Sequence, residues 1–69
     1  MPHYNVDIWA QKYRASDMVH LGRVALEFSV TASGADEASE ICWAKASRDA
    51  KKDGCHLVLL ESSVCEPWE

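Results

Sequence analysis

The histidines and cysteines are the residues of this chain best suited to metal or nucleophilic chemistry. The three histidines, His3, His20 and His56, are scattered and lack the spacing of a metal motif. Cys55 precedes His56 directly, but adjacent side chains on a strand point to opposite faces, so this pair cannot bind one ion. We therefore expect no metal site and no cofactor.

No catalytic site is predicted either. The carboxylates of Asp36, Glu37 and Glu40 form a cluster, but they fit the first turns of a helix, whose dipole favours negative charge. The three glycines are scattered and form no phosphate-binding loop. A Cys–His nucleophilic pair would need a pocket, which a fold of this size hardly offers. We expect a non-enzymatic protein; a small enzyme subunit ranks last, and a cleft holding a strongly perturbed titrating group would revive it.

The composition favours one small acidic domain. The 69 residues are 48% apolar, and we assign residues 1–69 to a single domain. A formal net charge of −4 argues against general phosphate binding and direct nucleic-acid contact. It suits simple solubility, a basic protein partner or mimicry of a nucleic acid. Two basic groups are minor exceptions: Lys12 with Arg14, and the basic residues from Lys45 to Lys52. The second group is typical of a helix C-terminus.

The expected compartment is the cytoplasm. The longest purely apolar run, Leu57 to Leu60, is far too short to span a membrane, and the N-terminal residues lack a signal-peptide pattern. The chain has an odd number of cysteines, at positions 42, 55 and 65. This number fits a reducing environment better than a disulfide framework.

The stretch from Ser33 to Gly54 predicts the only helix. Ser33 is the expected N-cap, with Asp36 completing a variant of the capping box, and Gly54 is the expected left-handed C-cap. At about 100° per residue, small side chains form one stripe that suits close packing on a sheet. The residues of this stripe are Ala35, Ala38, Cys42, Ala46 and Ala50.

Three segments predict strands. His3–Arg14 alternates, with Tyr4, Val6, Ile8 and Ala10 on one face. After a loop at Ala15–Gly22, Arg23–Thr31 places Val24, Leu26, Phe28 and Val30 on one face. In Cys55–Cys65 strict alternation places Val58, Leu60 and Val64 on one face and Leu57, Leu59 and Glu61 on the other. Residues 66–69 form a short acidic tail, in which Pro67 stops further pairing.

The predicted fold is α+β, with the element order ββαβ. If the first two strands form a hairpin and the helix crosses back over one face, the third strand pairs most naturally beside the first. This gives a three-stranded antiparallel sheet of order 2-1-3 with one helix on one face. A mixed sheet with the third strand beside the second is the alternative, and it needs a right-handed crossover.

One face of such a sheet stays open, and it is our predicted protein-binding surface. Aromatic and aliphatic side chains among carboxylates are typical of interfaces. The predicted residues of this face are Asp7, Trp9, Tyr13, Glu27, Leu57, Leu59 and Glu61. The alternatives are that long neighbouring side chains shield this face, or that two copies bury it in a homodimer.

The predicted helix reads ADEASEICWAKASRDAKKDGC, and the closing strand reads HLVLLESSV. With its acidic charge and its order of two strands, a helix and a strand, the chain resembles the small anti-CRISPR proteins of bacteriophages. It is similar in particular to inhibitors of type I systems, with the type I-C surveillance complex as the nearest expectation. The resemblance implies a protein that binds a Cascade subunit stoichiometrically and blocks recognition of target DNA.

Residues for that role come from the surface argument and not from a motif. Carboxylates can compete with DNA phosphates for a basic groove, and aromatic side chains add anchoring. The open-face carboxylates, or Asp36, Glu37 and Glu40 on the helix, would supply the charge. The rival hypothesis is a small cytosolic or antitoxin-like interaction module that homodimerises through the same sheet face.

Overall fold

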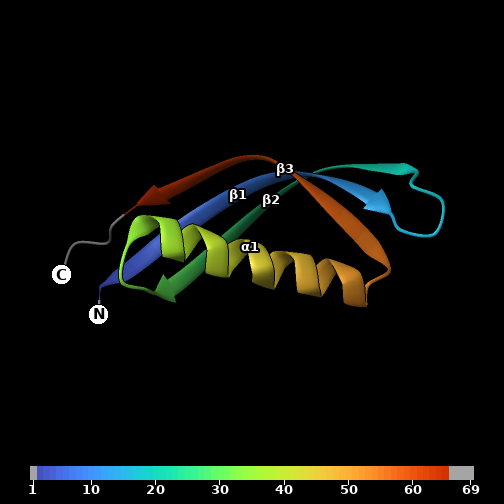
Figure 1. Cartoon of the computed structure of the whole chain (residues 1–69). Coiled ribbons are helices and arrows are strands. Elements are labelled where there is room, and N and C mark those ends of the chain that lie inside the picture. Colours follow the sequence, from blue (N-terminus) through green and yellow to red (C-terminus); the bar gives the residue numbers. More distant parts are fainter. Residues whose placement is uncertain (1, 66–69) are drawn as a thin grey trace.

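A computed structural model of the chain describes residues 2–65. Its elements follow the predicted order ββαβ (Figure 1), with β1 at His3–Arg14, β2 at His20–Thr31, α1 at Ala35–Lys52 and β3 at Cys55–Cys65. The predicted acidic tail, residues 66–69, lies outside the described residues.

The three strands form one antiparallel sheet of order β2-β1-β3, which confirms the predicted topology. β1 is central and pairs with both neighbours; Ile8, for example, lies opposite Leu26 on β2 and Ser62 on β3. Because β1 occupies the middle, its backbone hydrogen bonds are satisfied on both sides, whereas β2 and β3 each keep one edge that no other strand of residues 2–65 covers.

The core lies between α1 and the face of the sheet that the even-numbered residues of β1 form. As predicted, the side chains of Tyr4, Val6, Ile8 and Ala10 are buried. The helix buries the predicted stripe of small residues, with the exception of Ala35, which is exposed; the buried ones are Ala38, Cys42, Ala46 and Ala50. Val6, Ile8 and Cys42 are the largest fully buried side chains, so the core is small and depends on close approach of helix and sheet.

The helix begins one residue later than predicted. Gly34 is the N-cap and makes no side-chain capping bond, so the capping box of Ser33 and Asp36 is wrong. Ser33 Oγ donates instead to Glu37 Oε2 at 2.6 Å, because its position before the cap brings it beside that side chain. At the other end Gly54 has the predicted left-handed conformation, with φ of +72°, and its N–H donates to the carbonyl of Lys51.

A β-bulge in β3 overturns part of the predicted alternation. Trp9 pairs with Glu61, but the next residue, Ala10, pairs with Leu59, which leaves Leu60 as the extra residue of β3. One inserted residue reverses which side chains face the core from there on. The prediction that Leu57 lies on the open face is therefore wrong: it belongs to the core and is only 7% exposed.

The same bulge corrects three more placements. Leu59 lies opposite buried Ala10 and so belongs to the helix side of the sheet, where it is 44% exposed. Val58, opposite Gln11, lies on the open side, and the extra residue Leu60 lies next to Trp9. The two were predicted to share a face with Val64, but only Val64 packs against the core, opposite Val6.

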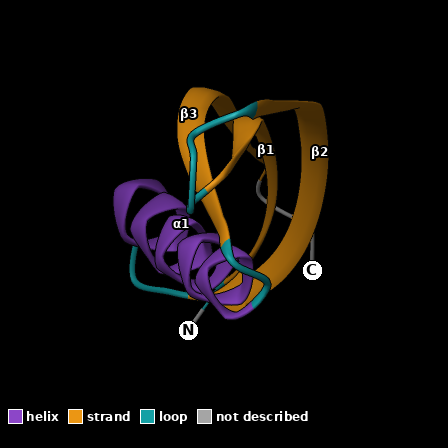
Figure 2. Cartoon of the chain, turned by 90° about the vertical axis from the view of Figure 1, so that its right-hand side faces the viewer, coloured by secondary structure: helices purple, strands orange, loops and turns teal. Residues whose placement is uncertain are grey.

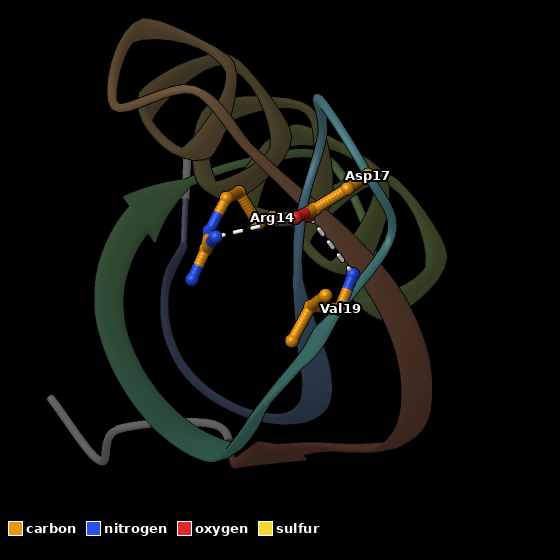
Figure 3. A network of polar contacts seen from close by, with 3 residues as sticks. All are labelled: Arg14, Asp17 and Val19. Atoms are coloured by element: carbon orange, nitrogen blue, oxygen red, sulfur yellow. Dashed lines mark hydrogen bonds and ion pairs between the residues drawn. The ribbon is translucent and has the colours of Figure 1, made fainter.

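The hairpin between β1 and β2 is tighter than the predicted loop, because β2 starts at His20 and not at Arg23. Asp17 organises the tip (Figure 3): its carboxylate accepts hydrogen bonds from the Arg14 guanidinium and from the Val19 N–H, both at 3.2 Å. Met18 takes a positive φ of 57°, a strained conformation for a side chain of its size. The Arg14 N–H also donates to the Val19 carbonyl and closes the turn.

The helix does not cover the sheet evenly. It packs most extensively against β3, and in an end-on view it lies away from the edge formed by β2 (Figure 2). The core-side residues of β2 consequently stay half-buried, although they were predicted on the same face as the fully buried side chains of β1. These residues are Val24, Leu26, Phe28 and Val30.

Candidate protein-binding face

The face of the sheet turned away from α1, called the open face below, is formed by odd-numbered residues of β1 and β2 and their partners on β3. Three of the predicted residues from β1 lie on it. Trp9 is 38% exposed, and Asp7 and Tyr13 are half-buried. Glu27 and Glu61 are exposed there, also as predicted.

Three carboxylates surround Trp9 on this face. Asp7 lies directly opposite Glu27 across the β1–β2 ladder, and Glu61 lies directly opposite Trp9 on β3. Directly opposed side chains have Cβ atoms about 4.5–5.5 Å apart, so the Asp7–Glu27 pair is repulsive. Within residues 2–65 the only ion pair joins Arg14 to Asp17, at the hairpin tip, so none of the three carboxylates is paired with a cation of this part of the chain.

A shallow hollow lies beside Trp9. Ala25 lies directly opposite Trp9 on β2, and its small side chain leaves room next to the indole. The residues that line it are Trp9, Arg23, Val24, Ala25, Leu60 and Glu61. The hollow combines an aromatic and an aliphatic side chain with one positive and one negative group, Arg23 and Glu61, which suits a protruding amphipathic side chain of another protein.

At the hairpin end of the open face, three side chains that carry rings lie in register across the sheet. Tyr13 lies between His20 on β2 and His56 on β3, and its ring centroid is 5.2 Å from that of His20. The Nε2 atom of His20 is hydrogen-bonded to Oε1 of Gln11. The Tyr13 and His20 rings are tilted by 51° to each other, so this end of the face carries a tilted pair of rings.

Sequence reasoning missed two members of this face. Val58 and Leu60 are each 43% exposed and occupy the place that was assigned to Leu57 and Leu59. The run of four apolar residues in β3 shows that both faces of this strand are apolar, but it cannot reveal which residue forms the bulge. The pairing of β3 with β1 was needed to find them.

The helix carboxylates form a separate group. Asp36, Glu37 and Glu40 are exposed on α1, and the sheet lies between them and the open face. One flat contact surface cannot use both groups at once. The helix carboxylates and the open-face carboxylates are therefore alternative binding groups, as in the prediction from the sequence.

The possible metal and nucleophilic groups are dispersed. Within residues 2–65 no three His, Cys, Asp or Glu side chains converge on a possible ion position. Cys42, Cys55 and Cys65 are free thiols. Burial raises the pKa of the Cys42 thiol, with a smaller opposing effect of the Lys45 charge, so this cysteine stays protonated and unreactive at neutral pH.

Comparisons with known proteins give no relative: no protein-family model, curated protein or solved structure matches the chain significantly. The helix of residues 2–65, α1, is not apolar enough to span a membrane.

Proposed function

We propose that this chain is a non-enzymatic inhibitor that binds through its open face to a basic, DNA-binding protein surface in the bacterial cytoplasm. The preferred target, which follows from the architectural resemblance, is a subunit of a type I CRISPR effector. Binding would block its recognition of target DNA by acidic mimicry.

The observation that carries the proposal is the set of three carboxylates, Asp7, Glu27 and Glu61, around the exposed side chain of Trp9. A groove that holds DNA must present lysines and arginines to phosphates. Carboxylates held in fixed positions on a sheet compete for those cations, and they also speed association with a basic partner. Trp9 and the neighbouring Leu60 supply apolar contact that charge alone does not provide.

Open carboxylate pairs of this kind cost folding stability, which supports a role in binding. The direct opposition of Asp7 and Glu27 is unfavourable in the isolated chain and becomes favourable when a cation of a partner lies between them. A purely structural role would favour opposite charges at these two positions.

The test is a titration of the protein into a purified type I effector with a labelled target duplex. We expect wild-type protein to displace DNA, and Asp7→Asn/Glu27→Gln/Glu61→Gln to weaken displacement by about tenfold or more and to reduce its salt dependence. Asp36→Asn/Glu37→Gln/Glu40→Gln is the matched control, because it removes the same charge from the helix side.

Each outcome has a clear meaning. Unchanged DNA binding at saturating wild-type protein would exclude the blocking mechanism. If only the helix variant loses inhibition, the helix carboxylates make the contact and the open face does not.

A second candidate is a homodimerising interaction module that uses the same face. The exposed apolar side chains of Val58 and Leu60 beside Trp9 favour it, whereas face-to-face packing would bring like carboxylates together. In a Trp43→Phe/Trp68→Phe background, a face-to-face dimer would shield Trp9 fluorescence from iodide. An inhibitor with a free open face would leave Trp9 accessible until its partner is added.

A further inference from the structure

Among the described residues, nothing covers the outer edge of β2. β2 is an edge strand of twelve residues, and the structure places no segment of residues 2–65 beside it. Natural edge strands are usually blunted by proline, lysine, a bulge or a covering loop. β2 contains no proline and no lysine, and its single register shift lies at the hairpin end, between the pairs of Lys12 and Tyr13. The other edge strand, β3, carries a bulge in its middle.

Both faces of β2 are incomplete in the isolated chain. On the helix side, Val24, Leu26 and Phe28 are half-buried because α1 lies toward β3. On the open side, Glu27 faces Asp7, while Arg23 takes part in no ion pair within residues 2–65. An arginine and a glutamate four residues apart therefore lie exposed on one face of a free edge.

We propose that two copies of this chain pair through β2, antiparallel, about a two-fold axis at Ala25. This dimer differs from the face-to-face dimer and does not depend on the proposed function. The sheets join into one of six strands, with both helices on the same side and one continuous open face.

The sequence around Ala25 is complementary to itself in this register. Arg23 of each copy lies opposite Glu27 of the other, and Ala25 lies opposite Ala25. On the helix side, Val24 lies opposite Leu26, and Phe28 lies opposite Gly22, where an aromatic ring covers the half-buried glycine. Each Glu27 then lies between Asp7 of its own strand pair and Arg23 of the second copy, so the unfavourable Asp7–Glu27 pair acquires a cation.

Other registers fail on charge or on side-chain direction. A shift that pairs open-side with helix-side residues is excluded, because directly opposed residues share a face. A two-fold axis at Arg23 or at Glu27 places like charges opposite each other. An axis at Val24 or at Leu26 leaves neither charge opposite its counterpart. Only the axis at Ala25 pairs Arg23 with Glu27, and it does so twice.

The first test uses charge reversal. Light scattering across a concentration series should show twice the mass of one chain for the wild type. We expect Arg23→Glu and Glu27→Arg each to weaken dimerisation by more than about tenfold, because each places like charges opposite one another twice. An equimolar mixture of the two variants should dimerise again, since opposite charges then face each other. This recovery also shows that both variants are folded.

The second test fixes the register. In a Cys55→Ser/Cys65→Ser background, Ala25→Cys should form an intermolecular disulfide under mild oxidation, because the two-fold axis brings this position against itself. Ser29→Cys, on the same face of the same strand, is the matched control and should not cross-link, since it lies opposite Leu21.

Two results would overturn the proposal. If the wild type stays monomeric to millimolar concentration, a second copy does not pair with β2, and the proposal is wrong. A dimer that survives both charge reversals, without cross-linking at Ala25→Cys, forms through another surface. Neither result bears on inhibition of an effector, so failure here is distinguishable from failure of the proposed function.

Discussion

Asp7 and Glu27 face each other directly across the β1–β2 ladder, and no cation within residues 2–65 is paired with either carboxylate. In a sheet, like charges at directly opposed positions are destabilising. The Asp7–Glu27 pair therefore lowers the free energy of unfolding, and this effect can be measured.

Asp7→Asn should stabilise the chain. We expect a gain of about 0.2–1 kcal/mol in the free energy of unfolding at low salt, because the substitution removes the repulsion and keeps the side-chain shape. The gain should shrink as salt rises, since the pair is partly exposed to solvent. Urea unfolding at two ionic strengths measures both effects. Asp36→Asn is the control of equal charge change; it should cost about 0.3–1 kcal/mol, because Asp36 favours the helix N-terminus.

Leu57 and Leu59 should respond very differently to truncation. Leu57 is buried in the core, so Leu57→Ala should cost about 2–4 kcal/mol, whereas Leu59→Ala, at a position 44% exposed, should cost less than about 1 kcal/mol. Urea unfolding of the two variants provides the measurement. Equal losses would contradict the difference in burial between these two leucines, which share the helix side of β3.

Cys42 should make the fold sensitive to alkaline pH. Burial raises the pKa of its thiol above the ordinary value of 9.0, so the unfolded chain releases this proton at lower pH than the folded chain. The stabilisation is complete below pH 9.0 and is lost as pH rises from there through the folded pKa.

The measurement compares the pH dependence of stability in the wild type and in Cys42→Ala. Cys42→Ala lowers the free energy of unfolding at neutral pH, and this constant difference is subtracted first. Above pH 9.0 the free energy of unfolding should then fall less in the variant than in the wild type. Parallel curves for the two proteins would show that Cys42 does not contribute to the alkaline transition.

Gly54→Ala should destabilise the chain through the backbone alone. Gly54 has φ of +72°, and an added Cβ would meet no atom within 4 Å, so the expected cost of about 1 kcal/mol comes from the left-handed conformation. Gly34→Ser is the matched control at the other helix end. Its backbone is extended, with φ of −165°, and serine at an N-cap should be neutral or stabilising by a few tenths of a kcal/mol. Thermal unfolding compares the two variants, and equal effects would contradict this difference.

Periodicity predicted the fold because its main signals are strong and local. The alternation of β1, the small-residue stripe of α1 and the left-handed Gly54 each indicate one structure, and the sheet order follows from the short connections. The N-cap was wrong because Ser33 and Gly34 are both acceptable caps, and only the backbone path decides between them.

The candidate site was predicted in part for the same reason. Asp7, Trp9 and Tyr13 lie on the regular strand β1, and period two places them correctly. Leu57 and Leu59 were wrong because the face of each depends on a bulge, and a bulge is decided by pairing with another strand, which no local pattern reveals. The uncovered side of β2 was missed as well, because the lateral position of a helix over a sheet depends on packing and not on periodicity.

The extra residue Leu60 also limits how this chain can change in length. Val64 and Leu57 contact the core from opposite sides of the bulge, seven positions apart, an odd interval that a regular strand cannot use for a single face. Loss of one residue between them would make the interval even, so both side chains could still face the core, but only in a regular strand without the bulge. A change of one residue in this segment therefore keeps both side chains in the core only if the bulge disappears, whereas a change of two residues can retain the bulge.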